Sequence, residues 1–325
     1  MAELASLSIS GSFTVGNTSM VEPGYIWFNS ETNKLEYSFF GETWSAGPSL
    51  ITARDQLGGA GEANAALAVG GYSNFAASSC TEEYNGTSWA SGGSLITGRK
   101  LTSSVGTQNA ALTAAGSTGF DGGVTCTEEY NGTSWSEGGA LSSLRYSGVA
   151  MGTQNEALYA GGFNCGIGRR YSCTEEYNGA SWSTGGAKIY ETGQNMGAGT
   201  QNAGLVFGGI SSYAQQSLTE EYNGTSWSTG AAMINRKESG GGAGTQNSAL
   251  TVGGVLSNTG YSDCTTQIYD GTSWSFGANN PDACLRGNAL VGSTVSALSF
   301  GGYLGYGITV VPSSKLLVGD QICSL

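Results

Sequence analysis

Four pairs of adjacent glutamates are the residues whose type and spacing come closest to a catalytic arrangement. Two carboxylates that face one substrate supply the acid and the base or nucleophile of glycoside hydrolysis. The pairs are Glu82 with Glu83, Glu128 with Glu129, Glu175 with Glu176, and Glu220 with Glu221. Each pair lies in a Thr-Glu-Glu-Tyr segment that we interpret as a β-strand, where adjacent side chains point to opposite faces. The two carboxylates therefore cannot converge on one substrate. We expect one in solvent and the other bound to arginine or backbone, with a bound cation as the weaker alternative.

Arginines recur about ten residues after most of the repeated tryptophans. They are Arg54, Arg99, Arg145, Arg236 and Arg286, while Thr192 stands at the expected position after Trp182. This periodic spread favours ion pairs between repeats over an arginine cluster in one site. The sequence contains no histidine, which excludes Ser-His-Asp catalysis, Cys-His catalysis and histidine-ligated metal sites. We therefore predict a protein that is not an enzyme, with no catalytic residue, no metal site and no cofactor.

Three of the seven cysteines occupy one repeat position. Cys80, Cys126 and Cys173 each stand just before a Thr-Glu-Glu-Tyr segment. Equivalent positions in neighbouring repeats are too far apart for a disulfide, which needs Cα atoms within about 7 Å. We expect these cysteines to be small buried thiols. Cys165 with Cys173 is the best disulfide candidate, since both flank one predicted hairpin loop.

An internal repeat covers most of the chain. TEEYNGTSW occurs at 81–89, 127–135 and 219–227, with related copies at 174–182 and 266–274 and a divergent one at 37–44. The repeated tryptophans, 45 to 47 residues apart, are Trp44, Trp89, Trp135, Trp182, Trp227 and Trp274. An apolar block ending in glycine, such as ALAVGG, accompanies each copy. Chance similarity does not explain six copies of both blocks.

Each repeat predicts four short β-strands. The first is Gly-rich, the second is the apolar strand, the third carries Glu-Glu-Tyr and the fourth carries the tryptophan. Asn-Gly between the third and fourth strands indicates a tight turn, since both residues tolerate positive φ. Four strands in a period in the mid-forties are typical of a β-propeller blade. We predict an all-β, six-bladed β-propeller, with seven blades as the alternative.

The order of arginine, Gly-Gly, tyrosine and tryptophan resembles the Kelch motif over about residues 24–303. The wording of the repeat is similar to Kelch-like arrays encoded by marine bacteriophages, among virion or tail-fibre-like proteins. The segment GYIWFNSETNKLEYSFFGETW also resembles short hairpin units of phage fibre proteins. These resemblances imply a Kelch-type propeller and a virion location.

The two ends of the repeat array complement each other. Third- and fourth-strand material occurs first, at Leu35 to Trp44, and first- and second-strand material occurs last, at Gly287 to Gly302. We expect these pieces to share one blade, so that pairing of N- and C-terminal strands closes the ring and removes exposed sheet edges. The predicted division is an N-terminal extension at 1–23, the propeller at 24–303 and a C-terminal tail at 304–325.

The connections between strands predict two unequal faces. The 1–2 and 3–4 turns share one face and read GTQN and NGTS around most of the ring. The 2–3 and 4–1 loops share the other face and vary from repeat to repeat. Aromatic side chains with polar neighbours on protruding loops suit protein or glycan recognition, although drift in unconstrained loops is the alternative. The candidate ligand-binding residues on these loops are Phe75, Phe120, Arg169, Arg170, Tyr171, Tyr213, Tyr261 and Tyr306.

The charge and hydropathy of the chain limit its partners. A net charge of −12 disfavours nucleic acid, whose phosphates require a basic surface. There is no apolar run of about 18 residues for membrane insertion and no recognisable signal peptide. Our first hypothesis is a non-enzymatic phage virion protein, a tail, fibre or decoration component, that contacts other virion proteins or a host receptor or glycan. The alternatives are a carbohydrate-binding lectin-type propeller and a cellular Kelch interaction adaptor.

Overall fold

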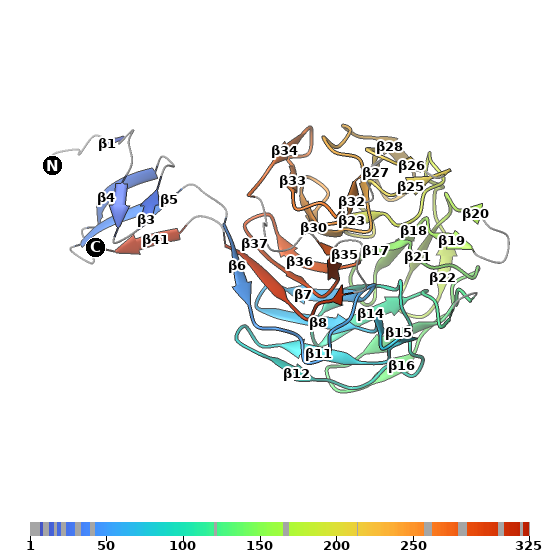
Figure 1. The fold of residues 1–325 in the computed structure, drawn as a ribbon. Helices are drawn as coiled ribbons and strands as arrows, with labels where there is room; N and C mark the ends of the chain where they lie inside the picture. Colours follow the sequence, from blue (N-terminus) through green and yellow to red (C-terminus); the bar gives the residue numbers. More distant parts are fainter. Residues whose placement is uncertain are drawn as a thin grey trace.

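The computed structural model describes short strands within residues 7–39, and then residues 43–119, 122–164, 169–212, 214–256, 262–278, 285–304, 309–318 and 321–324. The described residues form strands and turns without any helix, and hence without a helix that could cross a membrane. Six sheets, each of four antiparallel strands, are arranged around one axis. The ring can be followed in Figure 1. The chain is therefore an all-β, six-bladed propeller rather than a seven-bladed one.

The strands of each blade run in spatial order from the axis to the rim, and we number the blades in chain order. Blade 1 is β7 (Gly58–Glu62), β8 (Ala65–Val69), β11 (Thr81–Tyr84) and β12 (Trp89–Ser91). Blade 2 is β13 (Ser103–Thr107), β14 (Ala110–Ala114), β15 (Thr127–Tyr130) and β16 (Trp135–Glu137). Blade 3 is β17 (Val149–Gly152), β18 (Ala157–Ala160), β21 (Thr174–Tyr177) and β22 (Trp182–Thr184). Blade 4 is β23 (Met196–Gly199), β24 (Gly204–Phe207), β27 (Thr219–Tyr222) and β28 (Trp227–Thr229). Blade 5 is β30 (Gly241–Thr245), β31 (Ser248–Val252), β33 (Thr266–Tyr269) and β34 (Trp274–Phe276). Blade 6 is β36 (Ala289–Ser293), β37 (Ser296–Phe300), β40 (Ser314–Val318) and β6 (Thr43–Gly47). The innermost strands contact one another in a closed circle around the axis.

Blade 6 joins the two ends of the propeller, as predicted, but with different strands. The N-terminal side supplies only β6, and β40 from the C-terminal side supplies the third strand. The expected third strand near Leu35 instead lies in β5 (Lys34–Phe39). That strand pairs with β4 (Gly24–Asn29) and β41 (Gln321–Ser324) in a separate sheet. β40 takes the position because the chain leaving β37 returns directly alongside it, as in every other blade. The propeller thus spans residues 43–318 rather than 24–303.

The hydrophobic core is divided among the six interfaces between adjacent blades. Between blades 1 and 2, Leu67 and Val69 from β8 pack with Tyr130 and Trp135, and every other interface has an equivalent cluster. Burying each large apolar side chain contributes roughly 1.5–3 kcal/mol. The repeated tryptophan therefore holds blades to one another as well as strands within a blade.

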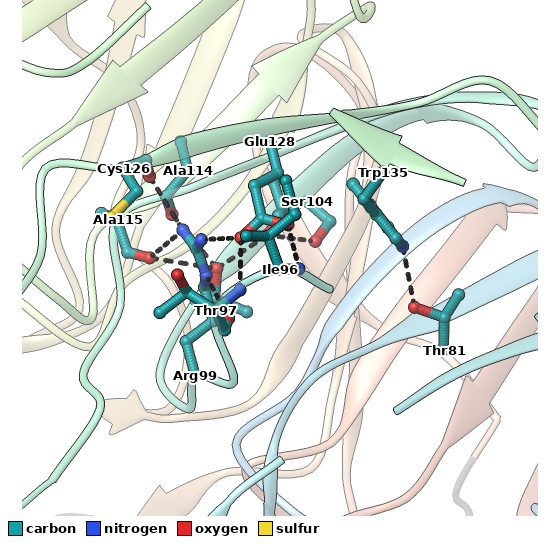
Figure 2. Close-up of polar contacts among 12 residues, drawn as sticks. Thr81, Ile96, Thr97, Arg99, Ser104, Ala114, Ala115, Cys126, Glu128 and Trp135 are labelled. Atoms are coloured by element: carbon teal, nitrogen blue, oxygen red, sulfur yellow. Dashed lines mark hydrogen bonds and ion pairs between the residues drawn. The ribbon is translucent and has the colours of Figure 1, made fainter. Parts of the chain in front are cut away.

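Hydrogen bonds from the repeated aromatic residues also cross the interfaces. Trp135 Nε1 donates to Thr81 Oγ1 of the preceding blade at 3.0 Å (Figure 2). The Tyr130 hydroxyl donates to Glu83 of that blade at 2.5 Å. The same tyrosine-to-glutamate bond recurs from blades 3, 4 and 5 to the blade before each. The second glutamate of each pair is thus half-buried and bridges blades, rather than standing in solvent as expected.

The GTQN turns add a third connection of this kind. The Gln108 side chain donates to the backbone oxygens of Ala66 at 3.0 Å and Tyr84 at 2.6 Å, both in the preceding blade. The equivalent glutamines Gln154, Gln201 and Gln246 make the same two bonds. The GTQN sequence therefore recurs on this face because its glutamine joins each blade to the one before it.

The first glutamate of each pair binds the loop that enters its own blade. In blade 2, Glu128 forms a buried ion pair with Arg99 and accepts the backbone N–H groups of Ile96 and Thr97 at 2.7 and 3.1 Å (Figure 2). Arg99 also donates to the backbone oxygen of Cys126 at 2.8 Å. We call this arrangement the clamp. It lies within one blade, whereas we expected ion pairs between repeats.

The clamp changes in composition around the ring. Blades 1 and 3 repeat it as Arg54 with Glu82 and Arg145 with Glu175. In blade 4 the cation is Lys188, 3.5 Å from Glu220. The arginine position can be found in every blade by one backbone hydrogen bond. The last glycine of the Gly block in the preceding blade donates its N–H to the backbone oxygen of the residue at that position, as Gly71 does to Arg99. The position falls on Thr192 in blade 4, Lys237 in blade 5 and Leu285 in blade 6.

Two predicted repeat arginines therefore stand outside the clamp. Arg236 is exposed and lies one residue before the buried Lys237, and Arg286 lies one residue after the buried Leu285. A shift of one residue along extended backbone turns the side chain to the opposite side. Lys237 lies 3.5 Å from Asp263, and Gln267 stands where blades 1 to 4 have the first glutamate.

The cysteine predictions are only partly met. Cys80, Cys126 and Cys173 are free thiols, but they are half-buried rather than buried. A free Cys173 excludes the candidate disulfide with Cys165, which itself lies outside the described residues. Cys264 takes part in a disulfide, which repeat position alone did not indicate.

Candidate functional site

The varied loops are the 2–3 and 4–1 connections, which strand order places at the end of the ring opposite the GTQN turns; we call this end the loop face. Phe75 lies at the tip of the hairpin of β9 (Tyr72–Ser73) and β10 (Ala76–Ala77), with 79% of its surface exposed. Its φ of 62° is a left-handed conformation that a bulky side chain rarely adopts. Phe75 is therefore presented to solvent, as expected for a contact residue.

The predicted basic pair lies on a second loop-face hairpin. Arg169 and Arg170 form β20 (Arg169–Arg170), which pairs with β19 (Phe163–Asn164). Arg169 forms an exposed ion pair of 3.0 Å with Glu191, and the Arg170 guanidinium lies 5.6 Å from the Phe163 ring centroid. The Tyr171 hydroxyl accepts from Asn164 at 2.8 Å. The other four predicted contact residues, Phe120, Tyr213, Tyr261 and Tyr306, lie outside the described residues.

A closed circle of backbone hydrogen bonds surrounds the axis where the 4–1 loops reach the innermost strands. Each blade contributes one residue, whose N–H donates to the backbone oxygen of the equivalent residue in the preceding blade at 2.7 to 3.0 Å. All six residues have positive φ between 55° and 66°. We call them the axial ring: Gln56, Leu101, Ser147, Gln194, Ser239 and Gly287.

The axial ring concentrates backbone strain at one place. Only one of its members is glycine, and a non-glycine residue held at positive φ costs of order 1 kcal/mol or more. Such strain persists where the surrounding structure enforces it, and it clusters at functional sites. Here the cyclic hydrogen bonding enforces the strained geometry.

A pocket of about 320 Å³ opens at the axial ring. All six ring residues line it, together with residues of the innermost strands and of the loop hairpins, among them Glu238, Arg286 and Tyr303. Below it, a narrower space of about 130 Å³ runs between the Gly-rich innermost strands. The innermost strands approach closely there, since a Cβ on Gly59 would lie 3.0 Å from that of Ala289 in blade 6. The two spaces share lining residues such as Thr102 and Asn288, so the pocket is the mouth of the axial space between the blades.

Charged groups alternate around this mouth. The residue before each axial-ring residue carries a charge in blades 1, 2, 5 and 6, as Asp55, Lys100, Glu238 and Arg286. The Lys100 amine lies 4.1 Å from the Tyr72 ring centroid, and the Arg286 guanidinium lies 4.0 Å from that of Tyr303. The acids and bases alternate in sign, so the mouth carries little net charge.

Burial affects the two acids of the mouth in the same way. It raises the pKa of Glu238, against the opposing effects of Gln215, Arg170 and Arg286. It also raises the pKa of Asp55, against those of Gln56, Lys100 and Arg286. The Arg286 guanidinium thus opposes the effect of burial on both acids.

Exposed aliphatic side chains recur on the 4–1 loops. Four isoleucines stand at one repeat position, and between 46% and 60% of the surface of each is exposed: Ile51, Ile96, Ile189 and Ile234. Their backbone N–H groups bind the clamp carboxylate or, in blade 5, the amide of Gln267. The clamp thus fixes the loops that present these side chains.

The axial site was missed at the sequence level. Its residues directly follow the repeated arginine position, and they differ from blade to blade as the loops do. No pattern of residue types distinguished them, although their place beside an otherwise regular motif was visible. Within the described part of the chain, no group of three or more His, Cys, Asp or Glu residues is arranged to hold a metal ion.

Comparison with known proteins identifies only the fold. No family model matches the chain, and no curated protein matches it. Among solved structures, the chain is similar to the one described as "Structure of YjhT", with a TM-score of 0.71 and 13% sequence identity over 85% of this chain and 99% of that one. At that identity the likeness carries fold and no more: the chain shares the six-bladed β-propeller architecture of that protein.

Proposed function

We propose that this protein is a non-enzymatic recognition propeller that acts through its loop face. The observation that carries the proposal is the inequality of the two faces. The repeated side chains of the GTQN turns are used to join blades, whereas the loop face exposes Phe75, the four isoleucines and an open polar pocket. Exposed aromatic and aliphatic groups beside polar ones suit contact with another macromolecule.

We further propose that this recognition takes place on a phage particle, as a tail, fibre or decoration component that contacts another virion protein or a host receptor. The resemblance of the repeat to phage-encoded arrays supports this location. Mass spectrometry of purified particles is the test, and absence of the protein from intact particles would overturn the virion role.

The loop-face role is tested separately, by adsorption of particles that carry variant protein. The quadruple variant Ile51→Ser, Ile96→Ser, Ile189→Ser, Ile234→Ser and the single variant Phe75→Ala should both reduce adsorption. The matched control is Val295→Ser, which changes an aliphatic residue that is 62% exposed in the turn between β36 and β37. Equal adsorption of all variants, combined with no loss of protein incorporation, would contradict a loop-face contact.

Carbohydrate recognition is the second candidate, favoured by the axial pocket. Its concave shape and convergent polar side chains are typical of small-molecule sites. It does not compete with the first proposal, since the host surface contacted by a virion protein can itself be a glycan.

A further inference from the structure

We propose that the axial pocket binds a neutral saccharide unit through the acceptor oxygens of Asn195, Glu238 and Asn288. This inference rests on the proposed recognition by the loop face and specifies the ligand chemistry of its central site.

The pocket contains buried acceptors that the described residues leave unsatisfied. Asn195 Nδ2 donates to Gly208 O and to Thr192 Oγ1, both at 3.0 Å, which leaves Asn195 Oδ1 as a buried oxygen without a donor. Asn288 Nδ2 donates to Ser299 Oγ at 3.0 Å and leaves Oδ1 in the same state. Buried polar atoms are nearly always hydrogen-bonded, and leaving one unpaired is costly. Two such oxygens in one pocket are therefore acceptors that a ligand with donor groups would satisfy.

Glu238 supplies a third acceptor beside them. Its Oε1 accepts from Gln215 at 3.2 Å, while Oε2 is buried without a partner among the described residues. Ser147 Oγ is a fourth unpaired atom of the pocket lining. A hydroxyl-rich ligand can donate hydrogen bonds to the three acceptors. It can also donate a hydrogen bond to the Ser147 hydroxyl or accept one from it.

The charges of the site select a neutral ligand. Arg286 lines the same pocket as Glu238. Burial raises the pKa of that carboxyl, and the Arg286 guanidinium, like that of Arg170, opposes this rise, so a negative charge there is already opposed by positive ones. An ammonium ligand would be repelled by Arg286. A carboxylate or phosphate ligand would place its lone pairs against the three acceptor oxygens. Hydroxyl groups meet neither difficulty.

The pocket also has an apolar side, as a sugar ring requires. Asn195 and Asn288 stand at one repeat position in blades 4 and 6, with Gly240 between them in blade 5, where the absent side chain leaves room. The same position in blade 1 is Leu57, which lies beside Leu101 of the axial ring. A saccharide with one polar edge and one apolar face would match both halves.

A neighbouring cavity gives room for a second unit. It has a volume of about 170 Å³, shares Leu101, Ser147 and Gln194 with the axial pocket, and is lined by Phe163 and Arg170. The Phe163 ring packs edge-on against Tyr146, at 5.4 Å between centroids. Aromatic and guanidinium groups beside the first unit extend the preference toward the end of an oligosaccharide chain rather than a free monosaccharide.

The experiment begins with the full chain, presented multivalently on an array of neutral, sialylated and sulfated glycans. Neutral glycans are expected to bind, and affinity for the best of them is then measured by calorimetry. Asn195→Leu and Glu238→Gln should each weaken binding about tenfold or more, the loss expected when one buried hydrogen bond is removed. The matched controls Asn155→Leu and Glu156→Gln change exposed residues of a GTQN turn and should leave affinity unchanged.

Three results would overturn the inference: binding to anionic glycans alone, no binding to any neutral glycan, or neutral binding that both pocket variants leave intact. Thermal unfolding of each variant distinguishes loss of the site from loss of the fold, and Gln194→Ala provides a second, milder pocket variant. The proposed function fails independently. If Phe75→Ala and the isoleucine variant impair adsorption while pocket variants do not, recognition stands and the saccharide site falls. If the pocket binds a neutral glycan but the protein is absent from particles, the saccharide site stands and the virion role falls.

Discussion

Blades 1 to 3 and blades 4 to 6 hold their entering loops with different chemistry at the same place. The first three use a buried arginine and glutamate, the fourth uses a lysine from a different position, and the fifth replaces the glutamate with Gln267. In the sixth, Leu285 and Lys315 occupy the two clamp positions.

The part of the clamp that persists from blade 1 to blade 5 is the acceptor for the loop backbone. Gln267 Oε1 accepts Ile234 N–H at 2.9 Å, as the glutamates do in earlier blades. Since replacing a buried ion pair by uncharged groups is often nearly neutral, the loop requires an acceptor rather than a charge. The charge of the clamp can therefore vary where the hydrogen bond to the loop backbone is kept.

The largest expected effect is the loss of a glutamate clamp. Glu128→Ala should lower the free energy of unfolding by about 3–5 kcal/mol, because it leaves the Arg99 charge buried without its partner. Gln267→Ala should cost only about 1–2 kcal/mol, because it removes hydrogen bonds without stranding a paired charge. Urea unfolding measures both, with the exposed Glu137→Ala of blade 2 as control. Equal losses of unfolding free energy in Glu128→Ala and Gln267→Ala would contradict the inferred difference between a charged and an uncharged clamp.

The lysine clamp of blade 5 should make stability depend on pH. Burial lowers the pKa of Lys237 to about 8, below its ordinary value of 10.5. Between these values the unfolded chain binds more protons than the folded one, so this residue's contribution to stability increases with pH. From pH 8 to 10, wild-type protein should gain on the order of 2 kcal/mol relative to Lys237→Met. Parallel pH profiles of the two proteins would show that Lys237 keeps its proton in the folded state across this range, and hence that burial does not lower its pKa.

The bond between Tyr130 and Glu83 gives a smaller effect at the interface of blades 1 and 2. Tyr130→Phe should cost about 1 kcal/mol at neutral pH. The matched control is Tyr84→Phe, because the Tyr84 hydroxyl donates to Gly86 O of its own turn at 2.9 Å and not to another blade.

This tyrosine also has a predicted signature in alkali. Burial, together with the bond to Glu83, raises the pKa of Tyr130 to about 12. Its stabilising contribution is therefore complete below the ordinary value of 10 and is lost as the pH rises toward 12. Chemical unfolding between pH 10 and 11 should show a smaller decline for Tyr130→Phe than for wild type. A decline of the same size in both would assign the alkaline loss to other groups.

The smallest effect tests whether blade 5 can be converted to the chemistry of blades 1 to 3. Gln267→Glu should raise stability by about 0.5–1 kcal/mol, because the Gln267 Nε2 group is buried without an acceptor among the described residues. The new carboxylate should also weaken the pH dependence attributed to Lys237. Destabilisation by this variant, with an unchanged pH profile, would show that blade 5 has lost the space for a carboxylate.

The sequence predicted the architecture because the repeat records it. The tryptophan, the Gly block and the Asn-Gly turn each recur once per blade, and all three have direct physical meanings. What it could not predict follows from side-chain direction and partner choice. Spacing alone did not separate Arg236 from Lys237, whose side chains point to opposite sides. It also placed the third strand of blade 6 near Leu35 rather than in β40, because the segment before Trp44 resembles the repeated aromatic block and the SKLLV of β40 does not.

The axial site escaped prediction for a related reason. Its strained backbone and unpaired oxygens arise from how six 4–1 loops meet at the axis, and no single repeat contains that information. Phe75 and Arg170 were found because an exposed aromatic or a basic pair stands out within one loop. Asn195 and Asn288 look like ordinary loop residues until the ring brings them to one pocket.

The composition of blade 6 has a consequence for the order of folding. β6 precedes blades 1 to 5 in the chain and β40 follows them, so contacts such as Ser314 Oγ to Pro48 O join residues 266 positions apart. During synthesis from the N-terminus, β6 must wait without its partner until five other blades have been made. Contacts of such long sequence separation form slowly. Closure of the ring is therefore expected to be the last step of folding, and the incomplete ring would expose the edge of β40 until β6 pairs with it.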